Sequence, residues 1–312
     1  MDTDTPTAAP SHVRGDTRVP LLDDTVGTLL SRVARTWPAQ PALVVPAQGV
    51  RLDWQGLDAA VTRLAAGLHA LGLRRGERIG IWSLNRAEWV LMQFATARAG
   101  LVLVNINPAY RTHELEYALA KSGCRALVLA RAFKTSDYLG LLRELVPGLG
   151  ERAPGELQSP RLPQLRHVLV LGDGDDVPGA WRFDAVAACD DPAAHAAIDA
   201  LQPTLDPDDP INIQFTSGTT GSPKGATLSH RNIVNNGFFI GERMRFSERD
   251  RLCIPVPFYH CFGMVLANLA CVTHGACMVV PGEGFDPLLT LQTVQDERCT
   301  ALHGVPTMFI AM

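Results

Sequence analysis

The chain has 312 residues, an apolar content of 46% and a net charge of −4 from 28 basic and 32 acidic side chains. This length is enough to bury a substantial core and to hold two subdomains. The charges are nearly balanced and form no basic block, which argues against nucleic acid as a partner. No apolar run approaches the ~20 residues that a membrane helix needs, so no transmembrane segment is expected.

The N-terminus and the cysteines indicate a cytoplasmic location. Residues 1–20 start with acidic residues and contain no apolar segment of a secretory signal, so they are predicted to form a disordered leader. The seven cysteines include no C-x-x-C pair, and most of them lie among apolar residues. We therefore expect buried thiols in a reducing cytosol rather than disulfides or zinc ligands.

From residue 43 onward, strand-like and helix-like segments alternate along the chain. Helical spacing marks a first helix that Gly72 is placed to end, with apolar positions at Leu57, Val61, Leu64, Leu68 and Leu71. Strands are predicted at residues 78–83, 101–105 and 125–129, and helices at 86–99 and 112–122. Repeated β-α-β units of this kind predict a largely parallel sheet that is covered by helices on both faces.

After a segment rich in proline and glycine, a second α/β series begins at Ile211. Its predicted strands continue at residues 252–256, 276–280 and 300–303, and its helices begin at 231, 262, 287 and just after 306. The expected fold class is α/β, with two doubly wound, largely parallel sheets flanked by helices. The expected segments are a first subdomain over 21–146, a variable connection over 147–205 and an incomplete second subdomain over 206–312.

Residues 216–225 read Thr-Ser-Gly-Thr-Thr-Gly-Ser-Pro-Lys-Gly and follow an apolar strand. Ser229 is a good N-cap for the helix predicted from Arg231. Glycines allow close backbone approach, amides and hydroxyls donate hydrogen bonds, and a lysine adds positive charge, so this segment suits phosphate binding. A Walker A loop is excluded, because Pro223 and Gly225 occupy positions where that pattern needs glycine and Ser or Thr. The plain alternative is a flexible surface loop.

The segment resembles the signature loop of the adenylate-forming superfamily, which includes acyl-CoA synthetases, aryl-CoA ligases, luciferases and peptide-synthetase adenylation domains. It matches every specified position of the family pattern Thr-Ser-Gly-Thr-Thr-Gly-x-Pro-Lys-Gly. The resemblance implies that Thr216 lies near Mg²⁺ and that Lys224 is both catalytic and phosphate-binding. It also implies that the phosphates of ATP are held by Thr216, Ser217, Gly218, Thr219, Thr220, Gly221 and Lys224.

A second group, Pro-Val-Pro-Phe-Tyr-His-Cys-Phe-Gly at residues 255–263, follows a short apolar strand. It is therefore placed at the carboxyl end of a parallel strand, where α/β sheets bind ligands. A lone histidine beside apolar residues is often structural, but this segment is similar to the family's Pro-x-x-His-x-x-Gly segment. The resemblance implies that Phe258, Tyr259 and His260 line the carboxylate site, with His260 catalytic, and that Gly304 belongs to the same substrate pocket.

Residues 258–265, 281–286 and 302–310 resemble the medium-chain fatty acyl-CoA synthetases within this superfamily. The resemblance implies ATP-dependent activation of a medium-chain carboxylic acid to an acyl-adenylate, and then transfer to coenzyme A. The family's later motifs and small C-terminal domain are not found in the chain, so we expect an N-terminal part that is inactive alone. Two alternatives stay open, namely a catalytically incomplete nucleotide-binding module and an aryl- or amino-acid-adenylating relative.

Overall fold

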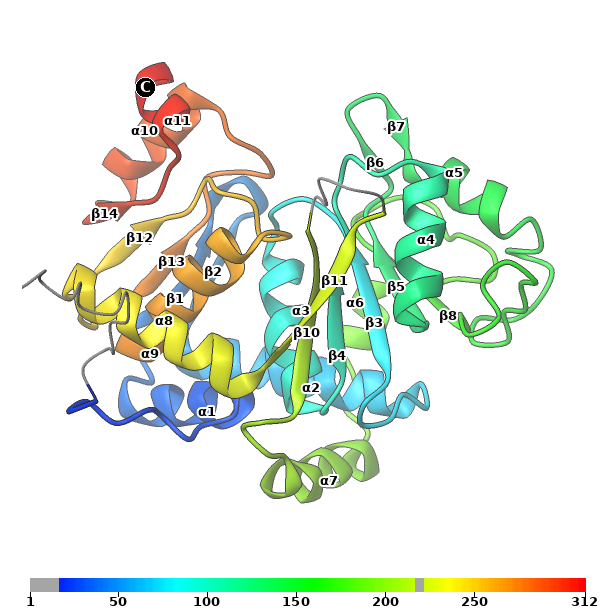
Figure 1. The fold of residues 1–312 in the computed structure, drawn as a ribbon, viewed down its shortest axis with the longest axis horizontal. Helices are drawn as coiled ribbons and strands as arrows, with labels where there is room; N and C mark the ends of the chain where they lie inside the picture. The colour runs from blue at the N-terminus through cyan, green and yellow to red at the C-terminus, as the bar shows by residue number, and fades with distance from the viewer. Residues whose placement is uncertain (1–16, 217–221) are drawn as a thin grey trace, which may run out of the picture.

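The computed structural model describes residues 17–216 and 222–312. Two sheets lie side by side, with helices between them and on the outer face of the larger sheet (Figure 1). The expected class of largely parallel α/β sheets flanked by helices is confirmed. Within the described ranges, no helix is long and apolar enough to cross a membrane.

The larger sheet has seven strands in the order β11-β10-β4-β3-β5-β8-β9. Neighbouring strands are parallel, except that β11 runs antiparallel to β10. In chain order the strands are β3 (Arg78–Trp82), β4 (Val102–Asn105), β5 (Cys124–Leu129), β8 (His167–Val170), β9 (Trp181–Arg182), β10 (Pro210–Thr216) and β11 (Lys224–Ser229).

The smaller sheet has five strands in the order β14-β12-β13-β1-β2, and only β2 is antiparallel to its neighbour. A separate two-stranded hairpin consists of β6 (Ala132–Phe133) and β7 (Ser136–Asp137). The strands of the smaller sheet are β1 (Pro41–Val45), β2 (Val50–Asp53), β12 (Arg251–Cys253), β13 (Cys277–Val279) and β14 (Ala301–Leu302).

Each sheet contains strands from both of the subdomain segments expected from the sequence, 21–146 and 206–312. Strands β1 and β2, from the segment 21–146, pair with the strands that follow residue 250. Strands β10 and β11, from the segment 206–312, instead extend the sheet that contains β3, β4 and β5. The division at residues 146 and 205 therefore does not follow the sheets, because local periodicity predicts a strand but not its partner.

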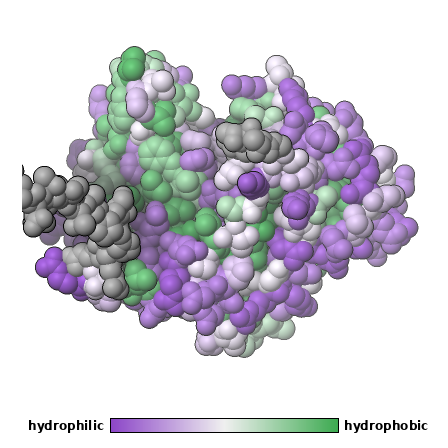
Figure 2. Space-filling model, viewed as in Figure 1, coloured by the Kyte–Doolittle hydropathy of each residue, from purple (hydrophilic) through white to green (hydrophobic). Residues whose placement is uncertain are grey.

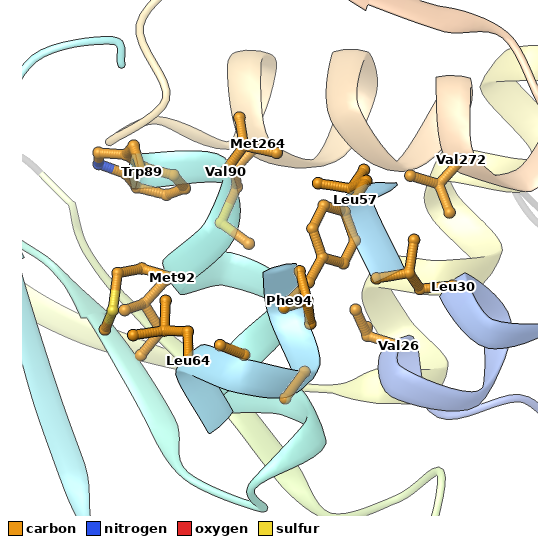
Figure 3. Close-up of a cluster of buried hydrophobic side chains, with 14 of the residues drawn as sticks. Val26, Leu30, Leu57, Leu64, Trp89, Val90, Met92, Phe94, Met264 and Val272 are labelled. Carbon is orange, nitrogen blue, oxygen red and sulfur yellow. The ribbon is translucent and has the colours of Figure 1, made fainter. Parts of the chain in front are cut away.

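A single apolar core fills the space between the sheets. Figure 3 shows side chains from α1 (Val26–Thr36), α2 (Trp54–Ala70), α3 (Ala87–Arg98), η3 (Phe262–Leu269) and α9 (Ala270–His274) meeting there, among them Leu30, Leu57, Phe94, Met264 and Val272. Both sheets also contribute inward-facing residues, such as Ile79 and Met278. Helix α8 (His230–Met244) packs against η3 and α9.

The opposite face of the larger sheet has its own apolar cluster. Helices α4 (Thr112–Ser122) and α5 (Tyr138–Leu145) cover it. The rings of Trp82 and Tyr138 stack there with their centroids 3.6 Å apart. Helices therefore lie on both faces of this sheet, as its apolar strands predict.

Helix α2 shows how local sequence predicts an element. Of the apolar positions predicted to face the core, Leu57, Val61, Leu64 and Leu68 are buried and Leu71, just beyond the helix, is partly buried. The helix begins where the Asp53 carboxylate accepts a hydrogen bond from Gly56 N at 2.7 Å. Just beyond its end, Gly72 has a φ of +91°, a conformation that favours glycine. The predicted end of the helix at Gly72 is thus confirmed.

Other elements depart from the expectations in informative ways. The segment 147–205, expected as a variable connection, contains β9 and two helices that were not predicted, α6 (Phe183–Ala187) and α7 (Pro192–Leu201). The helix predicted from Phe262 opens as the π-helix η3. The remaining helices are two single 3-10 turns, η1 (Pro46–Gln48) and η2 (Gln202–Thr204), and the C-terminal α10 (Pro287–Asp296) and α11 (Pro306–Ala311).

The cysteines behave as expected from their apolar neighbours. All seven are free thiols, and Cys124, Cys253, Cys271 and Cys277 are buried. Burial raises the pKa of Cys124 to about 11, so that thiol stays protonated.

Candidate functional site

Strands β10 and β11, which flank the middle of the predicted phosphate loop, form an antiparallel hairpin, and we call its end at Thr216 and Lys224 the hairpin tip. Thr216 and Lys224 are register partners on either side of the tip, and both side chains are exposed. The Thr216 hydroxyl has only a long contact of 3.4 Å to the Lys224 carbonyl oxygen. The loop residues Ser217, Gly218, Thr219, Thr220 and Gly221 lie outside the described residues.

The surroundings of Lys224 correct one expectation. The sequence predicts a helix from Arg231 and no strand between it and the lysine, but Lys224 opens strand β11, and α8 begins at His230, at the base of the hairpin. Strand β11 escapes prediction because it is an edge strand that is largely exposed and lacks an alternating apolar pattern. The N-terminus of α8 therefore does not point at the loop, although Ser229 caps it as predicted.

Helix α4 supports the hairpin near its tip. The Tyr117 hydroxyl donates a hydrogen bond to the Pro223 carbonyl oxygen at 3.0 Å. The Tyr117 ring also meets Phe215 edge-on, with the centroids 6.2 Å apart. Both sides of the loop are thus anchored, while Thr216 and Lys224 remain open to a ligand.

The second predicted group forms a loop after β12, with three different environments for its three candidate side chains. Phe258 is fully buried and packs against Trp89 with the ring centroids 5.6 Å apart. Tyr259 is half-buried and His260 is exposed. The Phe258 ring belongs to the core between the sheets, and its place in a substrate pocket stays a prediction.

The hydrogen bonds of His260 define its tautomer. Its Nδ1 accepts a hydrogen bond from the backbone N–H of Phe262 at 3.1 Å. A neutral imidazole with an accepting Nδ1 carries its proton on Nε2. His260 therefore presents an N–H donor on its exposed side.

Gly263 allows this loop to fold back on itself. A Cβ at this position would lie 2.7 Å from the Pro257 carbonyl carbon and 3.0 Å from Phe258 Cα. Such distances exclude any side chain without a shift of the backbone. The spacing of proline, histidine and glycine in this motif thus reflects a tight turn that displays His260.

Sequence reasoning missed three buried amide side chains that bind the backbone of this loop. Asn85 donates to Val256 O at 2.8 Å and accepts from Phe258 N at 2.8 Å. Gln93 donates to Met264 O at 2.9 Å, and Asn105 donates to Tyr259 O at 3.1 Å. The only sequence signal was an amide residue inside or beside an apolar element, as at Gln93 within the buried helix α3.

Residues that directly adjoin the two predicted groups are in contact near the carboxyl ends of β10 and β12. Gln214, two positions before Thr216 on β10, donates to the Met264 sulfur at 3.2 Å. Met264 follows His260 in the turn that opens η3. The structure therefore brings β10 of the larger sheet into contact with the turn that follows His260, near the carboxyl ends of the strands, where open α/β sheets place their ligands.

Gly304 lies beside the same loop, just after β14. The preceding residue, His303, contacts Phe262 with a ring centroid distance of 5.1 Å. Burial lowers the pKa of His303 to about 4, and its Nε2 lies 3.3 Å from the Met244 sulfur. A neutral His303 and the Phe309 ring, which packs over Gly304, make this side of the site largely apolar.

A polar cavity of about 560 Å³ opens farther along, where β3, β5 and β8 end. Arg86 crosses it and forms ion pairs with Glu88 and Glu283, each at 3.0 Å. Arg86, Glu88 and Glu283 therefore form ion pairs with one another inside this cavity.

Magnesium was expected near Thr216. Among residues 17–216 and 222–312, no cluster of three His, Cys, Asp or Glu side chains is arranged to hold a metal ion. The exposed Thr216 hydroxyl nevertheless fits Mg²⁺, which takes one or two protein oxygens and otherwise keeps water and phosphate oxygens.

Comparisons with known proteins agree with this architecture. The family described as "AMP-binding enzyme" matches residues 30–312. The medium-chain acyl-CoA ligase ACSF2, mitochondrial, of Homo sapiens is 44% identical over 98% of this chain and 50% of its own length. The Danio rerio protein of the same name is 42% identical over 98% of this chain and 51% of its own. A putative acyl-CoA synthetase of Bacillus subtilis, YngI, is 42% identical over 93% of this chain and 53% of its own.

Solved structures show the same fold. A putative long-chain-fatty-acid CoA ligase from Rhodopseudomonas palustris has a TM-score of 0.76 at 23% identity, covering 93% of this chain and 65% of that chain. The anthranilate CoA ligase AuaEII, in complex with anthranoyl-AMP, has a TM-score of 0.76 at 24% identity, covering 95% of this chain and 52% of that chain. This chain spans about half the length of the curated relatives it matches, and it belongs to the AMP-binding enzyme family.

Proposed function

We propose that this chain supplies the ATP-phosphate site and part of the acid site of an AMP-forming acyl-CoA ligase that acts on medium-chain carboxylic acids. The observation that carries the proposal is the contact between Gln214 and Met264, which joins the hairpin of the phosphate loop to the His260 loop. The printed names of the relatives that are 42–44% identical support the choice of acid.

In this proposal the hairpin tip binds the phosphates of ATP. The hydroxyls of Thr216, Ser217, Thr219 and Thr220 and the amides of Gly218 and Gly221 donate hydrogen bonds, and Lys224 offsets negative charge. Mg²⁺ beside Thr216 would neutralise phosphate charge when it is bound. Because the helix N-terminus lies elsewhere, the loop and Lys224 supply the positive potential at this point.

The acid would bind beside His260. Its carboxylate oxygen attacks the α-phosphorus, the bond to the bridging oxygen breaks, and pyrophosphate leaves. The exposed Nε2–H of His260 is placed to hold a carboxylate oxygen, with Tyr259 and Gly304 beside the acyl chain. The thiolate of coenzyme A then attacks the acyl carbon and displaces AMP.

Lysine labelling tests the phosphate site directly. Lys224 is one of only three lysines, together with Lys121 and Lys134, and all three are exposed. Acetylation with a limiting reagent, followed by mass spectrometry, should show that ATP protects Lys224 while Lys121 and Lys134 react unchanged. Equal labelling of all three lysines with and without saturating ATP would reject the site.

Chain-length dependence tests the acid. Affinity for acyl-sulfamoyl adenosines should rise by about 0.8 kcal/mol per CH₂ until the pocket is full and then fall. A maximum at intermediate length is expected, whereas preference for an aryl or aminoacyl analogue would identify an adenylating relative of another kind. A hydroxamate assay separates an acyl-adenylate-forming enzyme from a module that only binds nucleotide.

The cytoplasmic location remains a prediction. The ACSF2 relatives carry "mitochondrial" in their names, and fluorescence microscopy of the tagged chain with a mitochondrial marker distinguishes the two compartments.

A further inference from the structure

The backbone of residues 256–264 is bound by three amide side chains, Asn85, Gln93 and Asn105, which we call the amide clamp. All three come from the part of the chain that builds the larger sheet and its inner helix α3. They are only 2–3% exposed. A buried amide with its hydrogen bonds satisfied by one loop fixes that loop in one geometry.

Asn85 binds the loop at its entry. Its side chain donates to Val256 O and accepts from Phe258 N, both at 2.8 Å. This pair of bonds fixes the backbone of residues 256–258 beyond the end of β12. Phe258 is thereby directed into the core, and the next residues are turned outward.

Gln93 binds the loop at its exit, where η3 begins. It donates to Met264 O at 2.9 Å and accepts from Asn268 Nδ2 at 2.8 Å. A π-helix is rare, has a wider turn than an α-helix, and occurs most often at functional sites. Gln93 therefore ties two positions of the π-helix to α3 and sets where the Phe262 amide meets His260.

Asn105 binds the middle of the loop and joins it to the phosphate hairpin. Its Nδ2 donates to Tyr259 O at 3.1 Å, directly before His260. Its Oδ1 accepts from Asn212 Nδ2 at 2.9 Å, and Asn212 lies on β10, the strand that ends at Thr216. Asn105 thus hydrogen-bonds both to β10 and to the residue directly before His260.

We infer that the amide clamp positions His260 relative to β10, the strand that ends at Thr216, with Asn85, Gln93 and Asn105 acting as positioning residues. They do so by holding the Phe262 N–H against Nδ1, so that the Nε2–H donor faces the ligand. The identity of the ligand rests on the proposed function, whereas the positioning of His260 is inferred from the hydrogen bonds alone.

The test uses three single variants, Asn85→Leu, Gln93→Met and Asn105→Leu, each of which removes one set of clamp bonds at similar side-chain size. The matched control is Asn235→Leu, which replaces a buried asparagine of α8 that hydrogen-bonds to the backbone of Leu22. Two quantities are measured, namely the imidazole ¹⁵N shifts of His260, which report its tautomer, and the affinity for octanoyl-sulfamoyl adenosine.

Wild type and Asn235→Leu should show the Nε2–H tautomer of His260. The clamp variants should show a mixture of tautomers and bind the analogue about tenfold more weakly, the effect of one lost buried hydrogen bond. Any folded clamp variant that keeps both the tautomer and the affinity would overturn the inference for that residue.

Hydrogen exchange of the wild-type protein covers the case in which a variant does not fold. The side-chain amide protons of Gln93 and Asn105 should exchange slowly, because both are buried and hydrogen-bonded. Exchange as fast as that of an exposed amide would show that the clamp is not formed. If the wild-type protein does not bind octanoyl-sulfamoyl adenosine, the proposed function fails. The tautomer and exchange data would still show whether the amide clamp positions His260.

Discussion

The β10–β11 hairpin and the loop over residues 256–264 are in contact through Gln214 and Met264 but are stabilised in opposite ways. The hairpin exposes Thr216 and Lys224 and is held by main-chain pairing and by Tyr117. The His260 loop is bound by buried side chains from distant parts of the chain, and it places Phe258 in the core. A substitution at the hairpin tip should therefore change ligand binding alone, whereas one within the loop should change folding as well.

The largest effect is expected for Phe258→Ala. Removing a fully buried aromatic side chain typically costs about 3–5 kcal/mol of unfolding free energy. Chemical denaturation should show this loss, and Tyr259→Ala, which removes a half-buried ring, should cost clearly less. Equal costs at the two positions would contradict the division between an inward Phe258 and an outward Tyr259.

The base of the hairpin should respond to pH. Buried His230 accepts a hydrogen bond from Val26 N at 3.0 Å, and burial lowers its pKa from 6.5 to about 4. Between these values the unfolded chain binds a proton that the folded chain does not, so stability falls as pH falls from about 6.5 toward 4. The expected loss is on the order of 3 kcal/mol for His230.

Unfolding measured across this range checks the prediction, and His230→Asn is the control, since an asparagine oxygen can still accept from Val26. Because burial also lowers the pKa of His303 to about 4, the variant should retain part of the pH dependence. A profile identical to wild type would show that His230 does not contribute.

At the hairpin tip, Lys224→Ala should weaken ATP binding by roughly 1.5–3 kcal/mol, about ten- to a hundredfold, through loss of a charge-assisted contact. Stability should change by less than about 0.5 kcal/mol, because the side chain is exposed. Titration calorimetry with ATP measures the first effect, with Lys121→Ala as a matched exposed lysine. A loss of unfolding free energy as large as that of Phe258→Ala would contradict the expectation that the hairpin tip affects ligand binding alone.

The smallest effect is expected for Thr216→Val, which keeps the shape and removes the hydroxyl. A neutral hydrogen bond contributes about 0.5–1.5 kcal/mol, so ATP affinity should fall by a few-fold without a change in stability. The effect should grow when Mg²⁺ is present, if the hydroxyl contacts the ion. Calorimetric titrations with ATP, with and without Mg²⁺, compare the two cases. An equal loss of ATP affinity in both would show that the Thr216 hydroxyl does not contact the metal.

Local sequence was sufficient for most helices and strands. The apolar spacing of α2, the N-cap at Ser229 and the strands β3, β4 and β5 all depend on neighbours within a few residues. Edge strand β11 was missed, because exposure removes the alternating pattern that identifies a strand.

The sequence by itself determined the α/β class, the order of most helices and strands, and the ten-residue loop, because these follow from residues close together in the chain. Only the tertiary structure decided that β1 and β2 join the distal sheet, that Phe258 points inward, and that Asn85, Gln93 and Asn105 hold the His260 loop. Those outcomes depend on contacts between residues more than 150 positions apart, as between Asn85 and Val256. Local propensity carries no information about such partners, because burial and hydrogen-bond satisfaction are properties of the assembled fold.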